Sequence, residues 1–297
     1  MSSSAPSPGQ KRVPFNVARR VGFLGVLFKA AIGRGDFRVG LAIVSTFIAL
    51  AFVSFAYIPF DPLAAVGQSF QPPNGVHWFG TTNIGQDVFS QWLFGVRATL
   101  LVGFLAAALT AVLGVTTGIV AGYIARTDGP LMRIADVVLA LPTLPLLIVA
   151  AAFLKLADDV TVAFLIAVLS WAGMSRTLRS SVLTLKRLPF VEVAVLSNVP
   201  AYKIMFVDMM KHTLPLILTY SLFAVGGAIL SVASLDFIGV GPVTDYSWGS
   251  MIALANDNNA LLAGAWWWPL PPGLSIAVLI TGFALMAYGL EGSFKKV

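Results

Sequence analysis

The sequence contains no cysteine and only two histidines, His77 and His212, among its 297 residues. The absence of cysteine excludes disulfide bonds and thiolate metal sites, and the two histidines lie far apart in the chain. Charged residues are also scarce, at 11%, whereas hydrophobic residues make up 58%. A soluble domain of this length needs more charge on its water-facing surface. The composition therefore excludes a soluble globular protein and predicts one that lies in lipid.

Signals for nucleotide binding and ion coupling are missing as well. The phosphate-binding pattern GxxxxGK[ST] finds no match, so the chain is not expected to bind ATP through such a loop. No ionisable residue lies in the middle of a long apolar run, although ion-coupled carriers usually need one there. The nearest acids lie at the ends of the runs and are expected at the membrane interface: Asp136, Asp158, Asp159 and Asp236. We therefore expect a partner to supply the energy for any transport.

What the sequence does contain is six apolar runs. They span residues 39–58, 98–125, 137–154, 160–175, 214–235 and 269–290. Five are long enough for a helix to cross a bilayer, which takes about 17 to 20 residues. The fourth is shorter, but it extends past Arg176 if that side chain reaches the interface. The sequence therefore predicts an all-α membrane protein with six transmembrane helices.

Basic residues indicate the orientation of these helices, because Lys and Arg stay mainly on the cytoplasmic side. With both termini inside, seventeen of the 19 basic residues are cytoplasmic, and only Arg97 and Lys155 lie outside. The expected cytoplasmic parts are a disordered tail at 1–14, a segment at 15–38, a short loop at 126–136, a loop at 176–213 and a tail at 291–297. The expected extracytoplasmic parts are 59–97 and 236–268. This topology explains the net charge of +6, which therefore implies no nucleic-acid partner.

Two features inside the runs concern helix packing. Gly114, Gly118 and Gly122 recur at every fourth residue, so they share one helix face that a neighbouring helix can approach closely. Close packing is the favoured interpretation, and the alternative is that this stripe lines a pathway. Pro142 and Pro145 remove backbone donors in the third run and predict a kink there, either a hinge or a static bend.

The loop at 176–213 has apolar residues at helical spacing. Leu188, Val191 and Val195 are expected to share one helix face. Asn198 tolerates the left-handed conformation and predicts a turn, after which Pro200 suits the start of a second short helix. An exposed turn with Val199, Pro200 and Tyr202 would fit a groove on a cytoplasmic protein. The alternative is a helix that lies flat on the membrane surface.

The same loop carries a resemblance to a known family. Glu192, Val193 and Ala194, followed by Asn198 and by the run His212-Thr213-Leu214-Pro215, resemble the EAA loop of permease subunits of ATP-binding-cassette importers. In that family the loop docks the ATPase, which implies this role for Glu192, Val193, Ala194, Asn198, Val199, Pro200 and Tyr202. Asn198 stands where the family usually has Gly, and the interval to Leu214-Pro215 is longer by about one helical turn.

A second match lies before the second apolar run. The segment at 77–97 is similar to the H-P-L-G-T-D-x-x-G-R-D segment of the dipeptide/oligopeptide/nickel permease family, in its C-type subunit. The matching residues are His77, Gly80, Thr81, Gly85 and Asp87, with Gly95 and Arg97 following. Trp78 and Gln86 depart from the pattern. Further matches include Ser234 to Gly241 and Ser247-Trp248-Gly249, so the resemblance covers roughly residues 75 to 290.

Membership of this family implies a type I importer fold, with residues 98–290 as the permease core. The implied partners are a second, homologous permease in a pseudo-twofold heterodimer, two cytoplasmic ATP-binding subunits and an extracytoplasmic substrate-binding protein, all at the cell membrane. ATP and Mg²⁺ would be used by the ATPases, whereas this chain would bind no cofactor and would not be an enzyme. Peptides are the first choice of substrate, with oligosaccharides or nickel complexes as alternatives. A secondary carrier or channel is the alternative class.

The outer segment raises two further questions. His77 and Asp87 suggest a metal site, but selective binding usually takes three or four ligands, so we predict a structural cap near the docking surface of the binding protein. Arg97 is expected to pair with an acid or a carbonyl at the membrane edge.

The run at 266–268 consists of three tryptophans, which favour an interfacial anchor over a sugar-stacking platform.

Overall fold

The computed structural model describes residues 23–154, 158–241 and 246–294. Helices dominate these residues, and the only strand-like features described in them are two isolated bridges, Ala65 with Gln86 and Thr81 with Asp87. The expected tail at 1–14, the first part of the segment at 15–38 and Lys155 lie outside the described residues. The end of the expected tail at 291–297 lies outside them too.

The helices in chain order are α1 (Phe23–Ile32), α2 (Gly35–Ala56), α3 (Val88–Tyr123), α4 (Ala125–Ala140), α5 (Thr143–Leu154), α6 (Asp159–Leu185), α7 (Pro189–Leu196), α8 (Ala201–Lys203), the π-helix η1 (Ile204–Met209), α9 (Met210–Phe237), α10 (Trp248–Asp257) and α11 (Leu270–Phe294). Among the described residues, five helices are long and apolar enough to cross a membrane: α2, α3, α6, α11 and the continuous stretch Ala201–Phe237. Counting the bent pair α4 and α5 as one span gives the six that the sequence predicts.

The bent pair corresponds to the third predicted span. Helices α4 and α5 meet at an angle of 89°. The break falls at Leu141 and Pro142, where the proline cannot donate the backbone hydrogen bond that would continue α4. The predicted kink is therefore present. The predicted loop at 126–136 is wrong, because those residues form most of α4.

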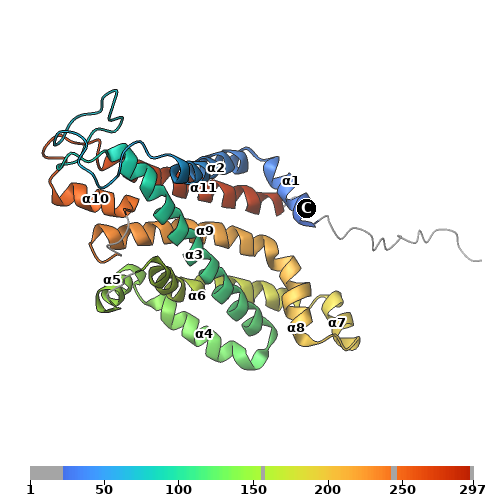
Figure 1. Cartoon of the computed structure of the whole chain (residues 1–297). Coiled ribbons are helices and arrows are strands. Elements are labelled where there is room, and N and C mark those ends of the chain that lie inside the picture. The colour runs from blue at the N-terminus through green and yellow to red at the C-terminus, as the bar shows by residue number, and fades with distance from the viewer. Residues whose placement is uncertain (1–22, 155–157, 242–245, 295–297) are drawn as a thin grey trace, which may run out of the picture.

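Helix α3 is the centre of the bundle. It packs along α6 and α9, while α11 packs between α2 and α9, as Figure 1 shows. The glycine stripe explains how close α3 and α6 come. A methyl group at Gly118 would lie 2.7 Å from the Ser175 carbonyl oxygen, and one at Gly122 would lie 2.7 Å from Val182. Gly114 likewise faces Met174 of α6. The three glycines thus lie at this helix contact.

Several helices extend beyond the predicted spans. Helix α3 begins at Val88, inside the segment expected outside the membrane, and α6 continues to Leu185, inside the predicted loop at 176–213. Polar caps fix the starts of α3 and α6. The carboxylates of Asp87 and Asp158 accept hydrogen bonds from the backbone N–H groups of Ser90 and Thr161, respectively. The apolar runs therefore do not mark where these helices begin or end.

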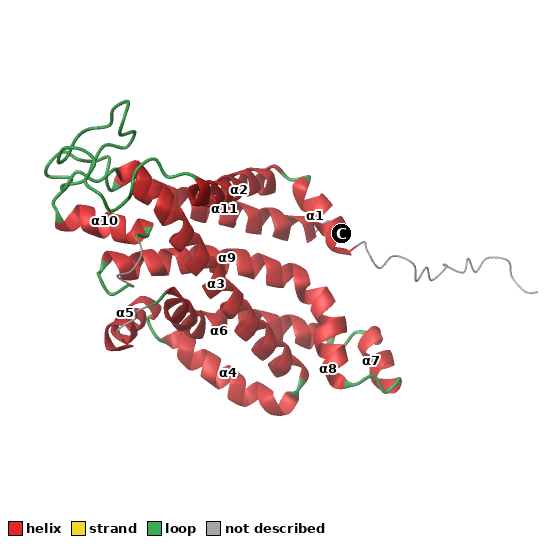
Figure 2. Ribbon diagram, viewed as in Figure 1, coloured by secondary structure: helices red, strands yellow, loops and turns green. Residues whose placement is uncertain are grey.

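The two ends of the bundle differ in content. At one end lies α10, together with residues 57–87. We call residues 57–87 the capping loop, and Figure 2 shows this loop as the largest non-helical region. At the opposite end lie α1, the end of α11, and residues 189–203, which we call the elbow. The elbow comprises α7, a tight turn and α8.

Candidate functional site

The turn of the elbow is a well-defined helix C-terminus. The N–H of Val199 donates to the Ala194 carbonyl (3.0 Å), and the N–H of Asn198 donates to the Val195 carbonyl (3.0 Å). These are the two hydrogen bonds of a Schellman motif, and they require a left-handed residue. Asn198 supplies it, with φ of 54°. The turn predicted at Asn198 is therefore confirmed.

The buried face of α7 is not the predicted one. Val191 is buried at 3% exposure, and Ala194 packs beside it against Ile204 and Met205 of the π-helix. Leu188 and Val195, expected to share the face of Val191, are exposed at 40% and 52%. The observed face joins Val191 to Ala194, three residues further along the helix. The predicted face joined Val191 to Val195, four residues further along.

The other face of the elbow is exposed and largely apolar. Its apolar side chains protrude from the bundle with exposed fractions of 61% at Val193, 78% at Leu196 and 66% at Tyr202. Glu192 and Pro200 are exposed beside them. Val199, which was expected to protrude, is half-buried against the cluster that holds Val191. The most exposed large apolar side chains of the elbow are therefore Leu196, Tyr202 and Val193, and Val195 is exposed to a lesser extent.

The second helix predicted after Pro200 does begin there, with Pro200 as the N-cap of α8, but it is not short. Helix α8 continues through the π-helix into α9, so residues 201–237 form one continuous helical stretch. The π-helical turn lies between Asn198 and Leu214-Pro215, the interval that is about one helical turn longer here than in the family pattern. The elbow is therefore attached directly to a candidate membrane span.

The capping loop is organised around a buried Asp87. One carboxylate oxygen lies 2.8 Å from Nδ1 of His77, and the other accepts from the Ser90 N–H (2.8 Å) and hydroxyl (2.7 Å). His77 is 4% exposed and Asp87 is 1% exposed. These bonds tie the loop to the start of α3. No group of three or more His, Cys, Asp or Glu side chains in the described residues could hold a metal ion.

Thr81 and two glycines fold the rest of the loop. The Thr81 hydroxyl donates to the Gln68 carbonyl and accepts from the Gln71 N–H (2.8 Å). Gly80 and Gly85 have φ of 64° and 80°, and a side chain on Gly85 would collide with the Gly67 carbonyl. The glycines are therefore needed for the backbone path itself.

Gly95 and Arg97 lie on the first turns of α3. Gly95 allows the backbone before α10 to approach, since an added methyl would lie 3.2 Å from the Tyr246 carbonyl oxygen. The Nε of Arg97 donates to the Ser54 hydroxyl (2.6 Å), and its guanidinium lies 4.0 Å from the Phe55 ring centre. The prediction of an acid or carbonyl partner is wrong, because a hydroxyl and an aromatic face of α2 are the observed contacts.

The tryptophan run is mostly part of the cap. Trp267 and Trp268 are buried, and the indole N–H of Trp267 donates to the Thr81 carbonyl (3.2 Å). Only Trp266 is exposed, at 54%. The interfacial-anchor interpretation is therefore wrong for two of the three, because the capping loop covers them.

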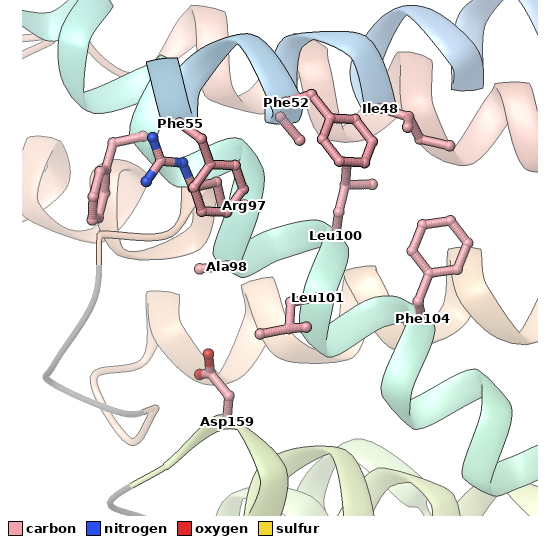
Figure 3. Close-up of a pocket in the computed structure, with 11 residues that line it drawn as sticks. Ile48, Phe52, Phe55, Arg97, Ala98, Leu100, Leu101, Phe104 and Asp159 are labelled. Atoms are coloured by element: carbon pink, nitrogen blue, oxygen red, sulfur yellow. The ribbon is translucent and has the colours of Figure 1, made fainter. Parts of the chain in front are cut away.

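A cavity lies where α2, α3 and the start of α6 come together. It has a volume of about 420 Å³, and Figure 3 shows the residues that line it. Its walls are aliphatic and aromatic except for Arg97 and Asp159. The sequence pointed to both charged residues separately, as an outer arginine and an interfacial acid. It gave no signal that they line one cavity.

Sequence reasoning also missed two ion pairs and one buried hydrogen bond to a carboxylate. Arg179 of α6 binds Asp128 of α4 with two hydrogen bonds of 2.5 and 2.6 Å, and Arg176 pairs with Asp136 on the same two helices. Asp236, expected at the interface, is instead buried and accepts from the Ser247 hydroxyl. None of these pairs is close in sequence.

Comparisons with known proteins agree with this architecture. Residues 114–294 match the family described as binding-protein-dependent transport system inner membrane component. The dipeptide transport system permease protein DppC of Alkalihalophilus pseudofirmus is 32% identical over 261 residues, which cover 85% of this chain and 83% of the relative. The DppC protein of Bacillus subtilis is 33% identical, covering 84% and 80%. The probable D,D-dipeptide transport system permease protein DdpC of Escherichia coli is 31% identical, covering 74% and 73%.

Proposed function

Because the chain belongs to the binding-protein-dependent transport system inner membrane component family, we propose that it is one permease subunit of an ATP-driven importer of short peptides. It is a multi-pass protein of the cell membrane. The family consists of membrane permease subunits of ATP-binding-cassette transporters, which are not themselves catalytic. ATP hydrolysis, with its Mg²⁺, accordingly belongs to partner subunits.

The observation that carries the proposal is the elbow. Its inner face is buried against the bundle, so it moves with the helices, while Val193, Leu196 and Tyr202 protrude from its other face. Apolar side chains on a short, rigid projection suit insertion into a groove of another protein. Because α8 runs on into α9, a displacement of the elbow passes directly to a membrane-spanning helix.

The remaining partners follow from the same proposal. A second, homologous permease completes a pseudo-twofold heterodimer, two ATP-binding subunits dock below the elbows, and a substrate-binding protein docks at the capping-loop end. Both termini then lie in the cytoplasm. The exposed apolar helix faces of α2 and α5 are available for lipid or for the second permease.

Peptides are the proposed cargo because the relatives are named for dipeptide and peptide transport, and the match to them covers most of their length. The match spans more than four-fifths of this chain and of the first relatives, so it includes both the capping loop and the elbow. Oligosaccharides and nickel complexes are the alternative cargoes.

The test is co-purification of the ATPases with elbow variants. Leu196→Asp and Tyr202→Asp place a charge on exposed side chains, so the chain should still fold and reach the membrane. We expect ATPase recovery to fall at least tenfold, because a charge is costly to bury at an interface. Leu262→Asp is the matched control, since Leu262 is 88% exposed at the capping-loop end.

Unchanged ATPase recovery in both elbow variants would show that the elbow is not the docking element. A second measurement concerns nucleotide chemistry: the chain purified without its partners should not hydrolyse ATP. Turnover by the lone chain would contradict the assignment of hydrolysis to separate subunits.

A further inference from the structure

Helix α1 lies at the depth of the lipid headgroups because of the helix that follows it. Helix α2 has 22 residues, or about 33 Å at 1.5 Å per residue, close to the roughly 30 Å of the hydrocarbon core of a bilayer. Its first residue, Gly35, is therefore near the headgroups, and only Gly33 and Arg34 separate it from α1. In Figure 1, α1 does not continue the line of α2 but turns across the end of α11.

One face of α1 is fixed to the bundle and another is exposed. Ala31 is buried in a small cluster with Phe37 and Leu290. The ring of Phe28 packs edge-on against that of Phe37, with the ring centres 5.6 Å apart. Phe28 is nevertheless 51% exposed, and Ile32, four residues further along the same helix face, is 41% exposed. An exposed apolar face at this depth suits the boundary between headgroups and acyl chains.

Three basic residues accompany this face. Lys29 is the neighbour of Phe28, Arg34 lies between the two helices, and Arg38 lies in the first turn of α2. Lys29 and Arg38 are exposed. Residues 1–38 and 291–297 together carry nine basic residues and two acids, Asp36 and Glu291. This end of the chain therefore keeps a large positive excess whatever partners its two acids have.

Arg34 is positioned by the end of α11. A methyl group at Gly292 would lie 2.5 Å from the Cζ atom of Arg34, so glycine leaves room for the guanidinium there. The side-chain hydrogen bond that the described residues give this guanidinium, to the Asp36 carboxylate, is long at 3.5 Å. A planar guanidinium suits bidentate binding of a phosphate.

We propose that the exposed face of α1 binds anionic phospholipids of the cytoplasmic leaflet, with Phe28 and Ile32 at the acyl chains and Lys29, Arg34 and Arg38 on the phosphates. The inference rests on the cytoplasmic location of α1 in the proposed function. Basic residues directly beside a membrane span are attracted to the negative surface of that leaflet. A homologous permease is a poorer occupant, because it too concentrates basic residues on the cytoplasmic side and would repel this face.

Lipid binding by the assembled importer tests the headgroup contact. The importer in neutral detergent is titrated with phosphatidylglycerol or phosphatidylcholine, and bound lipid is counted by native mass spectrometry. We expect phosphatidylglycerol to bind about tenfold more tightly. Lys29→Gln combined with Arg38→Gln should raise its Kd about tenfold and leave phosphatidylcholine binding unchanged, because only the charge attraction is removed.

The matched control is Arg126→Gln combined with Arg133→Gln. It removes two exposed basic residues from α4, on the same side of the membrane in the proposed topology, and should leave both lipid affinities unchanged. An equal loss of phosphatidylglycerol binding in the two pairs would show a diffuse attraction to cytoplasmic cations and would reject a site at α1.

The absence of cysteine allows the cover over α1 to be measured. Ile32→Cys places a single thiol of this chain on the exposed face of α1, and Leu262→Cys places one at the capping-loop end, where Leu262 is 88% exposed. Labelling of this chain by a neutral maleimide is followed with the importer in nanodiscs. We expect position 32 to react about fivefold more slowly in phosphatidylglycerol than in phosphatidylcholine, and position 262 to react equally in both.

Three results would overturn the inference. Equal affinity for the two lipids, in an importer that takes up peptides, would reject the lipid site and leave the proposed function standing. Shielding of position 32 only after the ATPases are added would mean that a partner protein covers α1. Displacement of the lipid by inorganic phosphate would mean that the basic residues bind free anions. An importer that kept the lipid preference but took up no peptide would count against the proposed function alone.

Discussion

The capping loop and the elbow are stabilised in opposite ways. The capping loop turns its polar groups inward, so that His77, Thr81 and Asp87 are buried and hydrogen-bonded. The elbow turns apolar groups outward, with Leu196 and Tyr202 among its most exposed side chains. From the sequence we predict a structural cap for the polar segment and an exposed docking turn for the apolar one.

This difference between the capping loop and the elbow indicates which of the two regions has groups available to bind a partner. Polar groups that satisfy one another within a loop are not available to a ligand, whereas apolar groups without cover at the end of a bundle are available to a partner. The capping loop should therefore respond to substitution mainly through stability. The elbow should respond mainly through assembly.

The largest effect is expected at Gly85 of the capping loop. Gly85→Val forces a β-branched residue to φ of 80° and into the Gly67 carbonyl. Strain and overpacking together should cost roughly 3 to 5 kcal/mol. Thermal unfolding of the purified importer in detergent, and the amount of chain in the membrane, measure the loss.

Gly75→Val is the control for this prediction. Gly75 lies in the same loop, but a side chain there meets nothing within 4 Å. It should be tolerated within about 0.5 kcal/mol. If Gly75→Val were as damaging as Gly85→Val, the loop would depend on glycine in general and not on this backbone path.

Asp87 should give the second largest effect. Asp87→Ala removes the cap of α3 and leaves the buried His77 and Ser90 without their partner, for a loss of roughly 2 to 3 kcal/mol. The control is Asp158→Ala, which removes the cap of α6 at an exposed site and should cost less. Equal losses of thermal stability in the two variants would contradict the central place given to Asp87.

The fold was largely predictable because lipid imposes a simple rule on sequence. Six apolar runs gave six spans, counting α4 and α5 as one, and Pro142 gave the position of the bend. Helix ends were less predictable. The start of α3 depends on Asp87, whose role as a cap requires a fold around it.

The candidate sites were predictable only where local geometry decides them. The turn at Asn198 follows from its conformational tolerance. The exposed face of α7 does not, because Val191, Val193 and Val195 have similar side chains and only the packing of η1 determines which is buried. That Arg97 and Asp159 line one cavity is a consequence of the tertiary structure, which their spacing in the sequence does not predict.

Two of the three valines of α7, Val191 and Val193, sharpen the comparison within one helix. Val191→Ala should cost roughly 2 kcal/mol of stability, because Val191 is 3% exposed. Val193→Ala should stay within about 0.5 kcal/mol, because Val193 is 61% exposed, yet it should weaken ATPase binding. Thermal unfolding and ATPase co-purification of both variants measure this split, and a reversed order of stability would show that α7 is rotated.

The smallest effect is expected at Asn198, where the family pattern has Gly. Asn198→Gly relieves the left-handed strain at φ of 54° and should stabilise the elbow by no more than about 1 kcal/mol, while ATPase recovery stays unchanged. Asn198→Val should cost roughly 1 to 2 kcal/mol at the same position, because a β-branched residue resists that conformation. If the Gly variant lost its ATPases while keeping its thermal stability, the Asn198 side chain itself would contact the partner. The elbow would then bind through a polar contact as well as through its exposed apolar residues.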